Sequence, residues 1–299
     1  MSRFAVRTLT LNPSIDVSSE AERVEPERKV RTCCERIDPG GGGINVARVL
    51  QRLGTSVEAV YLAGGATGDA FDALLEREKI ARRRVSIADD TRTSLTIHEH
   101  STSKEYRFVP EGPTITADEL DRCRQAIASA ESDYLVASGS LPPGVPIDFY
   151  AEVCSSFDRR FVLDTSSEEL RGALAVGGLF LLKVSGEEMS RDEALGAVRS
   201  RRTELVTLTL GRDGALLIAP DGTWSLPSFE VETVSTVGAG DSFLAGMTCG
   251  LARGLDRLDA FRLAVAAGAA ATLSPGTDLA YAADVDRLLP MVGQPQRVT

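Results

Sequence analysis

The residues best suited to chemistry lie in the run Ser235-Thr236-Val237-Gly238-Ala239-Gly240-Asp241, which precedes an apolar helical pattern ending near Leu251. Its small residues leave backbone N–H groups uncovered at a predicted helix start, where the aligned peptide dipoles favour negative charge. Asp241 places a carboxylate directly beside these donors. Phosphoryl transfer to a hydroxyl needs such donors for the transferring group and a base for the hydroxyl proton. On these residues alone, an ordinary helix start in which Asp241 serves the first turn is the alternative.

Small and charged residues also follow several predicted strands at their carboxyl ends, where open α/β sheets bind ligands. These positions are Asp16, Gly40 to Gly43, Ser138 to Gly144, Asp164 to Ser166, Lys183 to Glu188 and Gly211 to Gly214. The pattern predicts a single crevice. Consecutive glycines at 40–43 allow close approach of the backbone to a ligand, although a flexible turn before a helix is the other interpretation.

The known nucleotide fingerprints are missing from this sequence. The chain has no Gly-Lys dipeptide and so no P-loop, and Gly238-Ala239-Gly240 lacks the third glycine of the dinucleotide pattern. A nucleotide would therefore have to be held in another way.

Composition narrows the class of protein. The 299 residues carry a formal net charge of −10, which disfavours nucleic acid or an anionic membrane as a general partner. No window approaches a membrane span, and no apolar signal core follows Met1. The five cysteines form no Cys-x-x-Cys pair, which favours reduced thiols in a cytoplasmic protein.

His98 and His100 lie two residues apart on a predicted strand and share one face, a spacing compatible with metal binding. No third ligand lies nearby in the sequence. We therefore predict that both are ordinary residues of a flap.

Alternating strand and helix patterns predict one α/β domain over residues 1–299. Strands are predicted near 3–11, 57–62, 134–137, 160–163, 179–182, 205–210 and 215–219, and the main helices near 44–53, 116–130, 241–251 and 258–273. Two polar segments that leave the main sheet, at about 17–38 and 91–110, predict a small β flap. The second segment lies within a polar, alternating region that begins after Ile80. The tail, residues 293–299, is expected to be frayed.

At this point the motifs resemble the PfkB branch of the ribokinase-like sugar kinases, and within it the bacterial 6-phosphofructokinases. The resemblance covers nearly the whole chain. It is carried by the segments 9–16, 39–48, 63–68, 106–109, 138–144 and 235–242. It implies a ribokinase-like three-layer α/β/α core with a mostly parallel sheet and a small β-sheet lid from about 17–38 and 91–110.

Matched position by position, the resemblance implies a catalytic base at Asp241 and an anion hole at Gly238, Ala239 and Gly240. It implies sugar or sugar-phosphate contacts at Asp16, Lys29, Gly41, Gly42, Asn45, Arg92, Arg107 and Ser140. ATP contacts are implied at Lys183, Ser185, Thr209, Gly211, Ser235, Thr236, Gly238, Val265 and Gly268.

The resemblance also implies metal sites. Glu188 matches a position that holds Mg²⁺ through water. A monovalent cation, with K⁺ as the candidate, is implied at the largely backbone positions Ser235, Val237, Ala271, Ser274 and Gly276.

The activity implied is an ATP-dependent phosphosugar kinase that phosphorylates the C1 hydroxyl of fructose 6-phosphate to give fructose 1,6-bisphosphate. Tagatose-6-phosphate kinases and 1-phosphofructokinases share the same frame. A non-catalytic sugar-phosphate-binding regulator is a further alternative, because Ser185 replaces the asparagine of the family's magnesium motif and residues 189–204 form a short segment.

An isolated flap would expose a sheet face and two edges, so its pairing with a second flap predicts a homodimer. The resemblance points to the same assembly.

Overall fold

A ten-stranded sheet forms the centre of the protein in the computed structural model, which describes residues 4–229, 231–274, 276 and 278–298. Its strand order is β14-β13-β12-β11-β10-β9-β8-β1-β4-β5. The strands are β1 (Phe4–Thr10), β4 (Val57–Gly64), β5 (Ala81–Ile87), β8 (Ser132–Ser138), β9 (Arg160–Asp164), β10 (Leu179–Ser185), β11 (Thr203–Thr209), β12 (Ala215–Ala219), β13 (Gly222–Leu226) and β14 (Gln296–Val298). Neighbours from β11 to β5 are parallel, and β12 to β14 run antiparallel.

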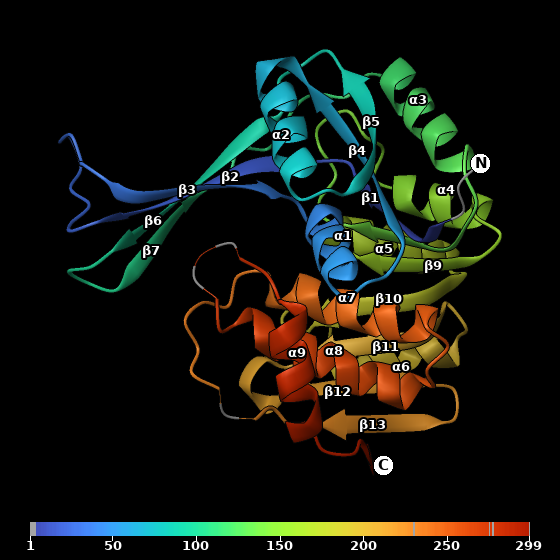
Figure 1. Ribbon diagram of the computed structural model, residues 1–299. Coiled ribbons are helices and arrows are strands. Elements are labelled where there is room, and N and C mark those ends of the chain that lie inside the picture. The colour runs from blue at the N-terminus through green and yellow to red at the C-terminus, as the bar shows by residue number, and fades with distance from the viewer. Residues whose placement is uncertain (1–3, 230, 275, 277, 299) are drawn as a thin grey trace.

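Helices cover both faces of this sheet (Figure 1). They are α1 (Gly42–Arg52), α2 (Gly65–Arg77), α3 (Ala117–Ala128), α4 (Phe149–Ser156), α5 (Ser167–Val176), α6 (Arg191–Arg199), α7 (Ala239–Ala252), α8 (Arg257–Ala271) and α9 (Ala282–Leu288), with short 3₁₀ turns at Gly211–Asp213 and Leu289–Met291. Tyr134 and Val136 of β8 pack into the core beneath α1, α7 and α8, whereas Leu135 and Ala137 pack beneath α3 and α4. Because both faces of the sheet are buried, the sequences of the central strands are nearly continuous runs of apolar residues.

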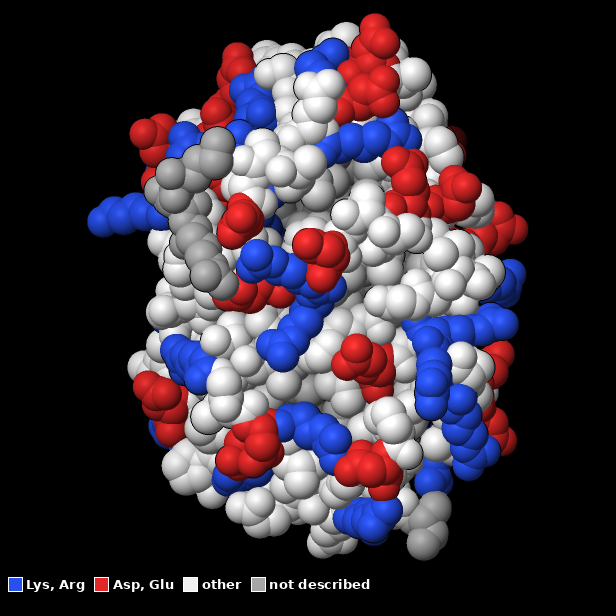
Figure 2. Space-filling model, turned by 90° about the vertical axis from the view of Figure 1, so that its right-hand side faces the viewer, with Lys and Arg blue, Asp and Glu red and all other residues white. Residues whose placement is uncertain are grey.

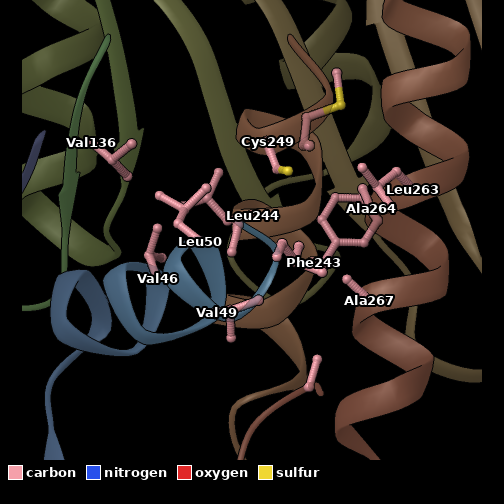
Figure 3. Packing of buried hydrophobic residues seen from close by; sticks show 14 of the residues in the cluster. Val46, Val49, Leu50, Val136, Phe243, Leu244, Cys249, Leu263, Ala264 and Ala267 are labelled. Carbon is pink, nitrogen blue, oxygen red and sulfur yellow. The ribbon is translucent and has the colours of Figure 1, made fainter. Parts of the chain in front are cut away.

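Helices α7 and α8 approach each other closely because glycines line their contact. A Cβ atom built on Gly246 would lie 2.8 Å from the Leu263 carbonyl oxygen, and one on Gly250 would lie 2.7 Å from Ala260 Cα. Figure 3 shows Phe243 and Leu244 of α7 between Leu50 of α1 and the residues of α8. This packing fixes the start of α7 relative to α1.

The second sheet, which we call the lid, has the order β3-β2-β6-β7 and extends away from the helices (Figure 1). Its strands are β2 (Ser14–Ala21), β3 (Cys33–Gly40), β6 (Arg92–Glu99) and β7 (Lys104–Phe108). Cross-strand pairing places Val17, Ile37, Leu95 and Phe108 in one row. Asp16, Ser18 and Glu20 point to the opposite face, since side chains alternate along a strand.

The predicted three-layer architecture with a mostly parallel sheet and a small β-sheet lid is confirmed. One strand was not predicted and one sequence prediction was wrong. Residues 81–87, in the polar region after Ile80, form β5 at the edge of the large sheet. Residues 296–298 are not frayed, because they pair with β13 as β14. The short segment of residues 189–204 contains α6.

Basic and acidic side chains are interspersed on the face of the molecule turned away from the lid (Figure 2). No broad basic field, of the kind that tracks a nucleic acid backbone, is visible on that face. Within the described part of the chain, no helix is both long and apolar enough to cross a membrane.

Candidate active site

The starts of helices α1 and α7 meet at a hydrogen bond between two side chains of the predicted site. Asn45 Nδ2 donates to Asp241 Oδ2 over 2.8 Å. Gly238 caps α7 with a positive φ of 73°, a left-handed conformation that glycine adopts without strain. The sequence run from Gly238 to Asp241 therefore forms a helix start with its carboxylate directed at α1, as expected for an anion-binding position.

The environment of Asp241 makes its carboxylate a base near neutral pH. Part of the residue is open to solvent, yet burial raises its pKa to about 7, and the nearby charge of Asp164 acts in the same direction. The Asn45 donor and the Lys183 ammonium oppose this shift. A carboxylate with a pKa near the working pH is well matched to accepting a proton in a reaction.

Lys183 lies beside this helix start at the end of β10. Its Nζ atom donates to Asp164 Oδ1 over 3.0 Å, and it lies 3.0 Å from the position of a Cβ atom built on Gly240. Although burial alone would lower the pKa of Lys183, the Asp164 and Asp241 carboxylates raise it. The lysine is therefore a fixed positive charge at the rim of the predicted anion hole.

Asp164 is a site residue to which the sequence assigned no role. It ends β9 between Ser138 of β8, whose Oγ donates to Asp164 Oδ2 over 3.1 Å, and Lys183 of β10. Its position directly after a predicted strand was the available signal. Its partner could not be identified without the strand order.

The glycine run 40–43 brings backbone against functional side chains. A Cβ atom on Gly40 would lie 2.0 Å from Asp16 Oδ2, and one on Gly42 would lie 2.2 Å from Ser138 Oγ. Gly41 has a positive φ of 109° and precedes α1. Burial raises the pKa of Asp16, although Ser14 Oγ donates to it over 2.5 Å. Asp16, Gly41, Gly42 and Asn45 thus gather around the start of α1.

Arg92 lies at the base of the lid, where β6 begins. Its two terminal nitrogens donate to the carbonyls of Pro110 and Asn12, each over 2.8 Å. Asn12 also donates to Ser140 Oγ over 3.4 Å. Arg92 and Ser140 line one pocket of about 510 Å³. The structure therefore brings these two predicted sugar-phosphate contacts together.

Lys29 and Arg107 lie apart from that group. Lys29 is exposed in the loop that joins β2 to β3, at the end of the lid marked by the pairing of Glu20 with Cys33. Arg92 pairs with Ser14, six residues earlier on β2, which is about 20 Å along a strand. Arg107 is exposed on β7 opposite Thr96. Within one chain, Lys29 and Arg92 are not neighbours.

The residues predicted to bind the nucleotide lie on the other side of the start of α7. Thr209 ends β11 and Gly211 follows it with a positive φ of 59°. Val265 is buried in α8, and a Cβ atom on Gly268 would lie 3.4 Å from the carbonyl oxygen of Ala239. These residues approach α7 from β11 and α8.

Ser185 forms hydrogen bonds with the carboxylate of Glu188. The backbone N–H and Oγ of Ser185 both donate to Glu188 Oε2, over 2.8 and 2.9 Å. One carboxylate oxygen is thus held in place by the residue that replaces the family asparagine. The replacement keeps a polar partner for this acid.

The predicted monovalent-cation positions form two segments that run side by side. Ser235 Oγ donates to the Gly276 carbonyl over 3.3 Å and accepts from the Val237 N–H over 3.2 Å. The N–H of Ser235 donates to the Thr272 carbonyl over 3.3 Å. Ala271 and Ser274 are buried close by in the chain. Thr236 lies between the two bonded residues of the first segment.

Comparison with known proteins identifies the family of this chain. Residues 10–283 match the pfkB family carbohydrate kinase family. Two relatives named ATP-dependent 6-phosphofructokinase isozyme 2 are similar over most of their lengths. The one from Mycobacterium tuberculosis is 40% identical over 97% of this chain and 91% of its own, and the one from Escherichia coli is 36% identical over 95% of this chain and 97% of its own. The 1-phosphofructokinase of Bacillus subtilis is 31% identical over 96% of this chain and 98% of its own.

The fold comparison leads to the same group. The solved structure of E. coli phosphofructokinase-2 in complex with fructose-6-phosphate superposes with a TM-score of 0.91 at 34% identity, over 97% of this chain and 99% of that one. Structures of the same enzyme include a complex with potassium and a tetrameric inhibited form. The chain belongs to the pfkB family of carbohydrate kinases, as its motifs suggested.

Replacing Asp241 with asparagine should stabilise the fold at pH 8. Since burial raises the folded pKa from 3.8 to about 7, the wild-type carboxylate destabilises the fold above pH 7, and this effect disappears as the pH falls towards 4. Asparagine removes the charge and keeps the volume. The expected gain is on the order of 2 kcal/mol at pH 8 and near zero at pH 4, measured by urea unfolding.

Asp158→Asn, at an exposed carboxylate, is the matched control and should change stability little at either pH. A variant at position 241 that is no more stable than wild type at pH 8 would contradict the raised pKa.

Proposed function

We propose that this protein is an ATP-dependent 6-phosphofructokinase, which transfers the γ-phosphoryl group of ATP to the C1 hydroxyl of fructose 6-phosphate. The observation that carries the proposal is the carboxylate of Asp241 at the start of α7, with a pKa of about 7 and a hydrogen bond to Asn45 on α1. Relatives at 36 to 40% identity carry this activity in their names.

In this proposal Asp241 accepts the hydroxyl proton as the oxygen attacks phosphorus. The N–H groups of Gly238 to Gly240 and the nearby ammonium of Lys183 balance the negative charge that spreads over the transferring group. Both contributions act mainly in the transition state, so they raise turnover more than substrate affinity.

The residues present fit an outer-sphere Mg²⁺ position. Ser185 holds one oxygen of Glu188, and the other oxygen is available to a water molecule of a hydrated ion, which Mg²⁺ retains readily. When bound with ATP, Mg²⁺ would neutralise charge on the phosphates. Thr209, Gly211, Val265 and Gly268 would hold the nucleotide.

A monovalent cation is proposed at the paired segments around Ser235 and Gly276. The supporting observations are the carbonyl-rich contact between these segments and the potassium complex of E. coli phosphofructokinase-2. Val237, Ala271 and Ser274 complete the proposed set.

We assign the sugar to the start of α1 and its phosphate to the side of Arg92. Asp16 and Asn45 offer acceptor and donor groups to hydroxyls, and Arg92 and Ser140 share one pocket of about 510 Å³. The fructose-6-phosphate complex of the E. coli enzyme supports this acceptor. Because a 1-phosphofructokinase is also a relative, fructose 1-phosphate is the alternative acceptor to be tested.

A substrate panel tests the activity. Purified protein with Mg-ATP should release ADP fastest with fructose 6-phosphate, compared with fructose 1-phosphate and tagatose 6-phosphate. Asp241→Asn should lower turnover by about 10² to 10⁴, with little change in substrate affinity. Near-normal turnover in this variant would overturn the role of Asp241, and background ADP release with every acceptor would favour a non-catalytic sugar-phosphate-binding protein.

Arg92→Ala should raise the KM for fructose 6-phosphate about tenfold or more, because a charge-assisted hydrogen bond to the phosphate is lost. The KM for ATP should stay the same. Lys104→Ala, which removes an exposed charge at the start of β7, is the control. An unchanged KM for the sugar phosphate would place the phosphate elsewhere.

We further propose a homodimer in which two lids cover each other's apolar face. The apolar row on the lid consists of Val17, Ile37, Leu95 and Phe108. Its two ends are exposed to solvent, since Ile37 is 48% and Phe108 55% exposed. E. coli phosphofructokinase-2 has been solved as a tetramer. Light scattering at micromolar concentration should show a dimer that Phe108→Asp dissociates, whereas a wild-type monomer would rule this assembly out.

A further inference from the structure

The outer end of the lid gathers an unusual set of metal-ligating side chains, which we call the lid-end cluster: Glu20, Cys33, Cys34, His98 and His100. The chain has only two histidines and five cysteines, so both histidines and two of the cysteines meet here. None of these residues belongs to the proposed phosphoryl-transfer site. Strand pairing brings them together, because Glu20 of β2 lies opposite both Cys33 of β3 and His98 of β6.

The ligand atoms of three of these side chains lie close together. One ligand atom each from Glu20, Cys33 and Cys34 lies within 4.8 Å of the other two. The two thiol sulfurs are 3.6 Å apart. Two thiolates that each lie about 2.3 Å from a tetrahedral zinc ion are about 3.8 Å apart. The spacing of the sulfurs thus suits a shared zinc ion.

Backbone geometry explains how adjacent cysteines can act together. Neighbouring side chains on a strand normally point to opposite faces. Here Cys34 has a positive φ of 56°, and the pairing of β2 with β3 shifts register between Ser18 and Glu20. A left-handed residue other than glycine is uncommon and costs conformational energy. At this bend both thiols come to the side of Glu20.

The histidines support the carboxylate from β6 and the turn after it. His100 Nε2 lies 3.1 Å from Glu20 Oε2, and the His98 ring contacts the His100 ring edge to face at 5.5 Å between centroids. A metal-binding carboxylate commonly has a partner of this kind, which orients it. His100 is therefore a positioning residue for Glu20.

We propose that Cys33, Cys34 and Glu20 bind one Zn²⁺ ion at the outer end of the lid, with water in the fourth position and His100 orienting Glu20. Two thiolates and a carboxylate form a ligand set that zinc accepts. Each thiol loses its proton as its bond to the ion forms, so binding releases protons to solvent. The ion would join β2 to β3 and close the base of the loop, residues 22–32, that carries Lys29.

Zinc titration of the chelator-treated full chain tests this site. Wild type should bind one Zn²⁺ per chain against a chromophoric competitor, and Co²⁺ should give a thiolate-to-cobalt charge-transfer band. Cys33→Ser and Cys34→Ser should each lose the band. Glu20→Gln and His100→Gln should weaken binding about tenfold or more. Glu27→Gln, at an exposed carboxylate in the loop, should bind like wild type.

Trypsin digestion supplies a second readout, because the loop contains Arg23, Arg28, Lys29 and Arg31. Zinc should slow cleavage there in wild type and in Glu27→Gln, and not in Cys34→Ser. Circular dichroism confirms that each variant is folded. Absence of stoichiometric binding in wild type, of the cobalt band, or of any weakening in Glu20→Gln would overturn the proposal. All five variants change residues outside the proposed phosphoryl-transfer site, so inactivity with every sugar would leave this result unaffected.

Discussion

A partly buried carboxylate at a helix start is the constraint on which the site depends. Asp241 lies where α7 begins, bonded to Asn45 of α1, and its charge is disfavoured by burial and by Asp164. Such a group persists only because surrounding packing fixes it. The glycine contacts between α7 and α8 and the apolar face of α1 supply that packing. The stability of these three helices thus maintains a carboxylate in surroundings that favour its protonated form.

The charged groups around Asp241 alternate in sign along the carboxyl ends of the strands. Asp164, Lys183 and Asp241 come from β9, β10 and α7, and the lysine lies between two acids that both raise its pKa. Because the sheet sets the spacing of β9 and β10, the order of charges is fixed by topology. A phosphoryl group entering this row would meet a fixed ammonium and peptide N–H groups with little rearrangement of the protein.

Several features of the fold and the site were predictable, for identifiable reasons. The small residues from Gly238 to Gly240 predicted the start of a helix. The resemblance to the family motif then predicted the role of each residue up to Asp241. β5 was missed because it contains three consecutive arginines, Arg82 to Arg84. Such a charged sequence is typical of a solvent-exposed loop, although here it forms an edge strand. Asp164 received no role because its partner Lys183 follows 19 residues later. The lid-end cluster depends on strand register between Glu20 and His98, which no local pattern reveals.

The arginines of β5 have a consequence for how the molecule avoids misassembly. This strand is one edge of the large sheet, and its arginines form ion pairs with Asp72, Glu58 and Asp69. A charged edge resists pairing with a strand from another chain. The opposite edge, β14, is three residues long in the part of the chain that the structure describes. Aggregation by sheet extension is thereby discouraged at both edges of the large sheet, which leaves the lid as the surface for the proposed homodimer.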